Sequence, residues 1–118
     1  MNWHHRGKNK YNNITVECDG YTFDSKRECL RYQQLKLMEK AGEITDLEVH
    51  PSYDVVINGE PVRYSVSKRP ISIELDFLYF DKVKGQKVVE DVKGRDNAVS
   101  RIKRALFEHI YGIKVKLT

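Results

Sequence analysis

Residues 71–94, with the sequence ISIELDFLYFDKVKGQKVVEDVKG, decide the fold that this chain is expected to adopt. From Ile71 to Phe80 apolar side chains recur at every second position, which is typical of a strand with one buried face. A turn over Asp81–Gln86 leads into a second strand over residues 87–93, and Gly94 ends that strand. The stretch therefore predicts an antiparallel hairpin.

Two acidic residues face each other across this predicted hairpin. A turn centred between residues 83 and 84 pairs Asp76 with Asp91, with their Cβ atoms about 5 Å apart. Two carboxylates at that distance repel each other, so one takes up a proton unless a cation lies between them. Lys93 is two positions after Asp91, so its side chain points to the same face of the strand. The hairpin thus gathers two acids and a base on one face.

The chain before this hairpin is predicted to form a shorter hairpin, a helix and further strands. Asp19-Gly20 favours a two-residue turn, Ser25 and Glu28 have the spacing of a capping box, and Gly42 can end a helix. Residues 60–70 are polar and are expected to be irregular. The expected elements are strands over Ile14–Cys18 and Tyr21–Phe23, a helix over Lys26–Ala41, and strands over Ile44–His50 and Tyr53–Ile57.

A second helix and a last strand are predicted after the central hairpin. Asp96 or Asn97 can cap the helix, which is expected to run to about Tyr111. A strand over residues 113–117 then completes a βαβ unit with the strand over residues 87–93. The buried stripe of the helix is predicted to consist of Val99, Ile102, Leu106 and Ile110.

The chain is expected to form a single α/β domain over residues 14–118, with a mixed central sheet flanked by helices. Its 118 residues fit one domain. Residues 1–13 are basic and show no periodicity, so they are either a disordered terminus or an arm that contacts DNA. No apolar run approaches the roughly 20 residues that span a bilayer, and the N-terminus does not resemble a signal peptide. We therefore expect a cytoplasmic protein without membrane contact, in which Cys18 and Cys29 are reduced, buried packing residues.

A third acid and the charge balance suggest the chemistry of the site. The net charge is +4, which favours a polyanionic partner. Glu28 lies on a helix face with apolar character, so it is expected to point toward the sheet. Mg²⁺ prefers carboxylate and water oxygens, lowers the pKa of bound water and neutralises charge on a phosphate. With Asp76, Asp91 and Lys93, which could orient the water or hold the phosphate, this pattern indicates phosphodiester hydrolysis.

Each of these residues also has an ordinary structural interpretation. Asp76 could be a surface charge, although it lies between apolar neighbours in the most apolar strand. Glu28 could be only the capping-box acid, and Lys93 could be a solvated strand end. Glu90 points opposite to Asp91, and it either forms a structural ion pair or contacts the site from behind.

The combination of Asp76, Asp91-x-Lys93 after a hairpin, and Glu28 on a preceding helix resembles the PD-(D/E)XK nuclease superfamily. That superfamily shares a restriction-endonuclease-like core of order αβββαβ, which is similar to the order of elements expected here. The sequence departs from the name-giving motif at Leu75, where a proline would stand. The wider sequence resembles a phage and prophage family within the superfamily, through residues 23–28, 35–42, 76–77 and 90–94, and through the helix with Lys103 and Phe107.

The resemblance implies a role for each matching residue. Glu28, Asp76 and Asp91 would bind Mg²⁺, for which Mn²⁺ could substitute, and Lys93 would be the catalytic lysine. Further cations would hold DNA phosphates, although exposed helix lysines are often plain solvated charges. These cations are Lys8, Lys10, Arg101, Lys103 and Arg104.

The function that the resemblance implies is that of a Mg²⁺-dependent DNA endonuclease. It would act on branched DNA, like a Holliday-junction resolvase, as a homodimer in phage or prophage DNA recombination inside a bacterial host. A chain of this size has little room for a sequence-reading domain, so recognition through phosphates is expected. Two alternatives stay open: a catalytically inactive nuclease-fold protein that binds DNA or assists assembly, and an enzyme that acts on RNA.

Overall fold

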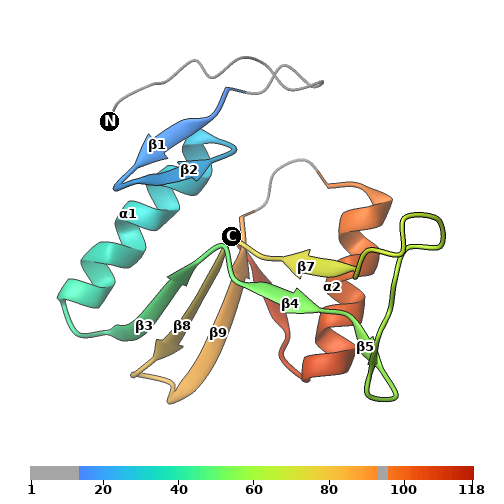
Figure 1. Cartoon of the computed structure of the whole chain (residues 1–118). Helices are drawn as coiled ribbons and strands as arrows, with labels where there is room; N and C mark the ends of the chain where they lie inside the picture. Colours follow the sequence, from blue (N-terminus) through green and yellow to red (C-terminus); the bar gives the residue numbers. More distant parts are fainter. Residues whose placement is uncertain (1–13, 93–95) are drawn as a thin grey trace.

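The computed structural model describes residues 14–92 and 96–118, which form a mixed α/β fold around a four-stranded sheet (Figure 1). The strand order is β10-β9-β8-β3. β9 runs antiparallel to β8 and β8 antiparallel to β3, whereas β10 runs parallel to β9. The predicted mixed sheet is therefore confirmed. The strands are β3 (Ile44–Val49), β8 (Phe77–Asp81), β9 (Gln86–Asp91) and β10 (Val115–Leu117).

Two helices cover opposite faces of this sheet. α1 (Lys26–Lys40) packs on one face together with the hairpin of β1 (Val16–Cys18) and β2 (Tyr21–Phe23). α2 (Ala98–Tyr111) packs on the other face, next to β7 (Ser72–Glu74). The α1-side core consists of Val16, Cys18, Phe23, Cys29, Tyr32, Leu35, Ile44, Phe77 and Tyr79. The α2-side core consists of Val55, Ile73, Leu75, Val89, Phe107 and Val115.

The helix ends follow the signals in the sequence. The Oγ of Ser25 accepts a hydrogen bond from the backbone N–H of Glu28 at 3.1 Å, so Ser25 is the N-cap of α1. Asn97 caps α2 by accepting from the N–H of Ser100 at 2.9 Å. Gly112 ends α2 in the left-handed conformation, with φ at 69°, where a residue without Cβ is favoured. The helix predictions are therefore confirmed to within one residue at α1.

The predicted register of the central hairpin is confirmed. Phe77 pairs with Glu90 and Asp81 with Gln86, around a turn of four residues. Continuing this register by one residue places Asp76 opposite Asp91. The backbone N–H of Asp76 donates to the carbonyl oxygen of Glu90 at 3.1 Å, so the pairing extends to Asp76. The two acids are thus held side by side by the backbone.

The prediction of one continuous strand from Ile71 to Phe80 is wrong. β7 pairs with β4 (Ser52–Asp54), and β8 belongs to the central sheet, so the chain changes partner at Leu75 and Asp76. The N–H of Leu75 donates to the carbonyl oxygen of Pro51, and the N–H of His50 donates to that of Asp76. The odd-numbered side chains are buried both before and after the break, so the alternation of buried and exposed positions continues through it. The periodicity therefore could not reveal it.

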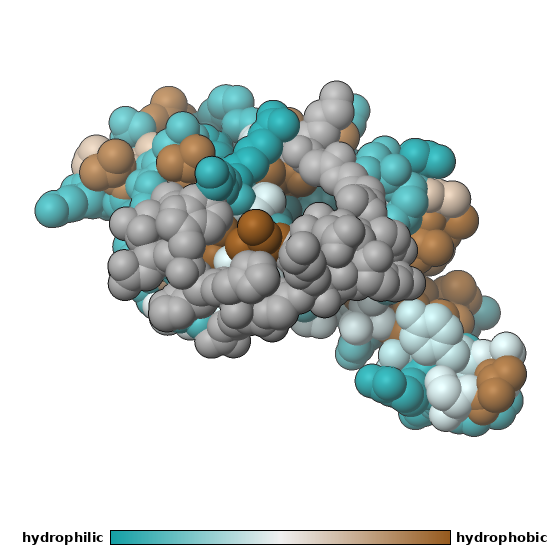
Figure 2. Space-filling view, turned by 90° about the horizontal axis from the view of Figure 1, so that it is seen from above, coloured by the Kyte–Doolittle hydropathy of each residue, from teal (hydrophilic) through white to brown (hydrophobic). Residues whose placement is uncertain are grey.

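Residues 55–71 form a projecting hairpin arm, which corrects the prediction that residues 60–70 are irregular. β5 (Val56–Ile57) pairs with β6 (Glu60–Pro61) through a turn at Asn58-Gly59. Beyond it, the N–H of Tyr64 donates to the carbonyl oxygen of Arg69 at 2.9 Å. Residues 63–70 are all exposed, and Figure 2 shows this arm as a lobe with hydrophobic and hydrophilic side chains. The base of the arm, at Val55, is buried in the α2-side core, and only its tip over residues 63–70 extends away from it.

The buried stripe predicted for α2 is wrong in its first half. Val99 and Ile102 are 62% and 60% exposed, whereas Leu106 and Ile110 are partly buried against the α2-side core. The helix packs through its C-terminal half, where Phe107 is fully buried and its ring stands 4.8 Å from that of Tyr53. The helical period therefore predicted the buried face of α2 correctly only in the part of the helix that the sheet contacts.

The prediction of reduced cysteines is also wrong. Cys18 and Cys29 form a disulfide that joins β1 to α1, with their Cα atoms 6.4 Å apart. Their predicted burial is confirmed, since Cys29 is fully buried and Cys18 is 9% exposed. The hairpin packs directly on α1, which brings the two side chains together. The count of two cysteines could not show that contact.

In the part of the chain described, no helix is long and apolar enough to cross a membrane.

Candidate active site

Three acidic side chains meet where α1 begins, β8 begins and β9 ends. Glu28 lies in the first turn of α1, Asp76 immediately precedes β8, and Asp91 is the last residue of β9. All three are partly buried. Each carboxyl group affects the pKa of at least one of the others. The convergence expected from the sequence is therefore present in the structure.

Asp76 and Asp91 form the most strongly perturbed pair of this site. Burial raises the pKa of Asp76 to about 7, and the neighbouring charge of Glu28 acts in the same direction. Burial also raises the pKa of Asp91 to about 7, together with the charge of Asp76. The Oδ2 of Asp76 accepts a hydrogen bond from the N–H of Val92 at 2.6 Å, which fixes its orientation. The pair therefore resists carrying two negative charges without a cation.

Glu28 takes part both in the helix cap and in the acidic site. The hydroxyl of Ser25 donates to its Oε2 at 3.1 Å, as the capping interpretation expects. Burial raises the pKa of Glu28, while hydrogen bonds from Asp76 and Ser25 act against that rise. One carboxylate oxygen of Glu28 lies within 4.8 Å of one of Asp76, so the start of the helix meets the strand pair here. The two interpretations of Glu28 are thus not exclusive.

His50, which was not predicted from the sequence, completes a group that could hold a metal ion. One ligand atom each from Glu28, His50 and Asp76 lies within 4.8 Å of the other two. His50 follows β3 with a positive φ of 55°, and its ring stands 5.4 Å from that of Phe23. Imidazole and carboxylate ligands together suit Mn²⁺ and similar divalent cations, and the carboxylates alone suit Mg²⁺. The only signal in the sequence was a histidine before Pro51 at the end of a predicted strand.

Arg104 brings positive charge to the edge of the site. Its Nη1 lies 3.5 Å from the Oδ2 of Asp91, and its Nη2 donates to Asp96 at 2.7 Å. Its side chain is only 17% exposed. Arg101 also pairs with Asp96, at 3.4 Å, but is exposed on the surface. Of the predicted phosphate-binding cations that the structure describes, Arg104 is therefore the one in contact with an acid of the site.

The other predicted residues divide into one on α2 and several that the structure does not describe. Lys103 is partly buried on α2, and no contact joins it to the three acids. Lys93, the predicted catalytic lysine, lies outside the described residues, as do Lys8, Lys10 and the whole predicted arm over residues 1–13.

Glu90 forms a structural ion pair on the opposite face of β9. It is fully buried, and its two oxygens accept hydrogen bonds from Nε and Nη2 of Arg31 at 2.7 and 2.6 Å. The hydroxyl of Tyr79 also donates to it. Burial acts to raise the pKa of Glu90, but the hydrogen bonds from Arg31 and Tyr79 outweigh burial and lower it. Of the two interpretations left open for Glu90, the ion pair is present.

Comparison with known proteins identifies a family but no activity. Residues 8–118 match the sequence model of a family described as "Protein of unknown function (DUF1064)". No curated protein and no solved structure matched the chain.

Proposed function

The chain belongs to the DUF1064 family, whose description gives no function, and we propose from its site that it is a divalent-cation-dependent DNA endonuclease. The reaction is the hydrolysis of a phosphodiester bond. The observation that carries this proposal is the convergence of Glu28, Asp76 and Asp91, with two pKa values raised to about 7. Partly buried acids held together without a compensating cation destabilise a fold, so their presence favours a functional role.

The donor set fits a hard divalent cation. Carboxyl groups whose pKa is raised by one another gain most from a cation placed between them. Asp76 and Glu28 would hold the ion with His50 or with Asp91, since these groups are the available ligands. A bound Mg²⁺ or Mn²⁺ would supply an activated water and neutralise charge on the phosphate.

Other residues of the chain would act on the substrate and the water. Arg104 stands beside Asp91 and would pair with a phosphate oxygen, for which a guanidinium is well suited. Lys93 follows Asp91 by two positions and would orient the water or hold the scissile phosphate. The guanidinium of Arg104 favours the ionised form of Asp91, against the effect of burial on its pKa.

The order of the elements supports a relationship to PD-(D/E)XK nucleases. Around the central sheet, α1, β3, β8, β9, α2 and β10 follow one another as helix, three strands, helix and strand. This is the order αβββαβ of the restriction-endonuclease-like core. We propose this fold relationship together with its consequences: branched DNA as substrate, a homodimer for paired cuts, and a role in phage or prophage recombination in the bacterial cytoplasm.

A cleavage assay tests the proposed activity. Linear duplex, flap and four-way DNA are incubated with the full chain in Mg²⁺ or Mn²⁺. We expect cleavage that EDTA abolishes, with a preference for the branched substrates. Asp91→Ala should lower the cleavage rate by about a thousandfold or more, since it removes a carboxylate of the proposed ion site.

Asp54→Ala is the matched control for Asp91→Ala. Asp54 is an exposed strand aspartate on β4, outside the site, so its loss should leave cleavage within about twofold of the wild type. Absence of cleavage by the wild type on every substrate, with DNA binding retained, would instead support the inactive DNA-binding alternative. Equal rates for wild type and Asp91→Ala would contradict the proposal.

A further inference from the structure

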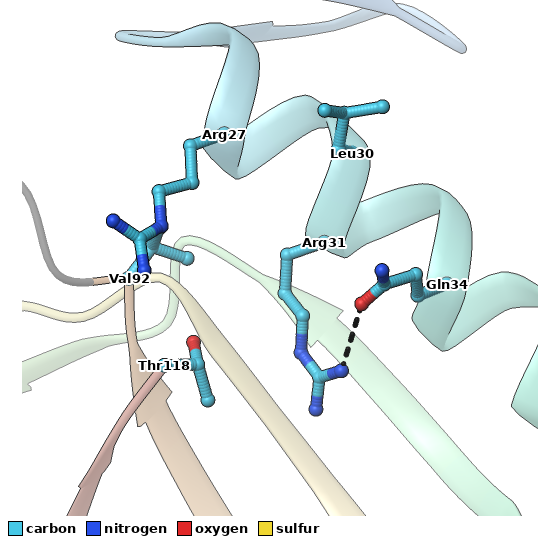
Figure 3. A pocket seen from close by; sticks show the side chains of 6 residues that line it. All are labelled: Arg27, Leu30, Arg31, Gln34, Val92 and Thr118. Carbon is cyan, nitrogen blue, oxygen red and sulfur yellow. Dashed lines mark hydrogen bonds between the residues drawn. The ribbon is translucent and has the colours of Figure 1, made fainter.

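A cavity of about 290 Å³ lies between α1 and the ends of β9 and β10 (Figure 3). Its helix side is formed by side chains three or four positions apart, which therefore share one face of α1. Its strand side is formed by the residues that follow β9 and β10. The lining residues are Arg27, Leu30, Arg31, Gln34, Val92 and Thr118.

The cavity shares its strand wall with the acidic site. The N–H of Val92 donates to the Asp76 carboxylate at 2.6 Å, so Val92 lies between the cavity and the acids. The N–H of Thr118 donates to the carbonyl oxygen of Asp91 at 3.1 Å. A group bound in the cavity would therefore be a neighbour of a group bound at the carboxylates.

Arg27 gives the cavity a positive charge that no acid of the described residues neutralises. Figure 3 shows the side chains of Arg27 and Arg31 extending from α1 toward the strand ends, with Arg27 reaching Val92. Arg31 forms an ion pair with Glu90 at 2.6 Å and donates a hydrogen bond to Gln34 at 3.0 Å. Among residues 14–92 and 96–118, Arg27 has no acidic partner. The cavity thus carries one uncompensated guanidinium.

Thr118 adds a polar group that lacks a partner. Its Oγ1 is buried, and among the described residues no atom forms a hydrogen bond with it. A buried hydroxyl without a partner costs free energy, and an acceptor placed in the cavity would remove that cost. A guanidinium and a hydroxyl donor on facing walls are a suitable pair for an anion with several oxygen acceptors.

We propose that this cavity binds a phosphate of the DNA backbone, next to the phosphate held at the carboxylates. The inference rests on the proposed function for the identity of the substrate. Three acids repel a polyanion, so DNA needs nearby cations to lie against them, and Arg27 adds one on the α1 side to Arg104 on the α2 side. Arg27 and Thr118 would bind a phosphate that is not cut, which fixes the position of the strand relative to the catalytic ion.

A binding measurement on the full chain tests this proposal. Fluorescence anisotropy with labelled four-way DNA is carried out in Ca²⁺ in place of Mg²⁺. We expect Arg27→Ala to weaken binding about tenfold, as for a lost charged hydrogen bond, and to lower the slope of log K against log salt by about 1. Lys40→Ala, a matched charge removal at the far end of α1, should change binding less than twofold. Thr118→Val should weaken binding without lowering the Tm.

The outcomes separate this inference from the proposed activity. Binding of Arg27→Ala equal to that of Lys40→Ala overturns the phosphate site, even if the wild type cleaves DNA. A specific binding defect in Arg27→Ala supports the site, even if no DNA is cut and the endonuclease proposal fails. Inorganic phosphate and a mononucleotide serve as competitors. If they displace DNA only at high competitor concentration, the result supports a backbone phosphate. If they displace it at micromolar concentration, the cavity belongs to a free phosphate compound and the proposal is overturned.

Discussion

At the scale of single residues, the acidic pair has opposite effects on chemistry and on stability. Asp76 and Asp91 have pKa values of about 7 in the folded chain, against an ordinary value of 3.8. A carboxyl group with a raised pKa favours the folded state only while it is protonated. The same repulsion that prepares the pair for a cation therefore weakens the fold when no cation is present.

This repulsion predicts how stability depends on pH. Below about pH 4 both acids are protonated in the folded and unfolded states, and the stabilising effect is complete. As the pH rises from 4 to 7 the unfolded chain loses its protons first, so the free energy of unfolding falls, and it levels off above 7. In EDTA, we expect the Tm of the wild type to decrease from pH 5 to pH 7.5, as measured by circular dichroism.

Asp91→Asn removes one charge of the pair and should stabilise the metal-free protein. Because Asp91 is partly exposed, solvent screens much of the repulsion, and we expect a gain of about 1 kcal/mol, or about 4 °C, at pH 8. Asp54→Asn provides the comparison at an exposed strand position. Added Mg²⁺ should raise the Tm of the wild type more than that of Asp91→Asn. A variant less stable than the wild type in EDTA at pH 8 would argue against this account.

The sequence allowed part of the site to be predicted because that part is local. Asp76 and Asp91 are joined by one hairpin, so the position of the turn determined their pairing. Glu28 could be predicted as a site residue because it lies on the helix face that was expected to point toward the sheet. His50 was not, because it reaches the acids through the pairing of β3 with β8, which joins residues far apart in the sequence. No local spacing relates His50 to Glu28 or Asp76.

At the scale of secondary-structure elements, helical period alone did not determine burial. The apolar stripe of α2 continues into its first turn, but the sheet contacts only its later part. Strand β10 is only three residues long, so it covers little of the helix. The extent of a packing partner is a tertiary property, which the sequence of the helix does not contain. The break between β7 and β8 was missed for the same reason.

Substitutions in α2 should separate its two halves. Ile102→Ser and Val99→Ser remove side chains that are mostly exposed, so each should change the free energy of unfolding by about 0.5 kcal/mol or less. Phe107→Ala empties a fully buried position and should cost about 3–5 kcal/mol. Urea unfolding of the three variants measures the difference. Comparable losses at positions 102 and 107 would mean that the first half of α2 is covered in solution.

At the scale of the whole molecule, the central sheet couples the two cores. Phe77 on β8 belongs to the α1-side core, and Val89 on the neighbouring β9 belongs to the α2-side core. The backbone hydrogen bonds between β8 and β9 therefore join the two faces. A loss of packing on one face removes support for the strands that the other face needs.

The shared sheet predicts a single unfolding transition. Phe77→Leu and Val89→Ala act on opposite faces, and each should lower the free energy of unfolding by about 1–3 kcal/mol. In both variants fluorescence and circular dichroism should report the same midpoint in urea. Two separate transitions in either variant, with only one shifted, would contradict the coupling of the cores.

The pairing of β3 with β8, described above as the source of the His50 contact, also has a consequence for the order of events in folding. The hairpin of β8 and β9 can form early because its loop is short, whereas β3 must close a much longer loop. A chain with only the hairpin formed holds Asp76 and Asp91 but neither Glu28 nor His50. Tight binding of a divalent ion would therefore follow the slowest long-range contact, and the appearance of bound metal would mark the end of folding.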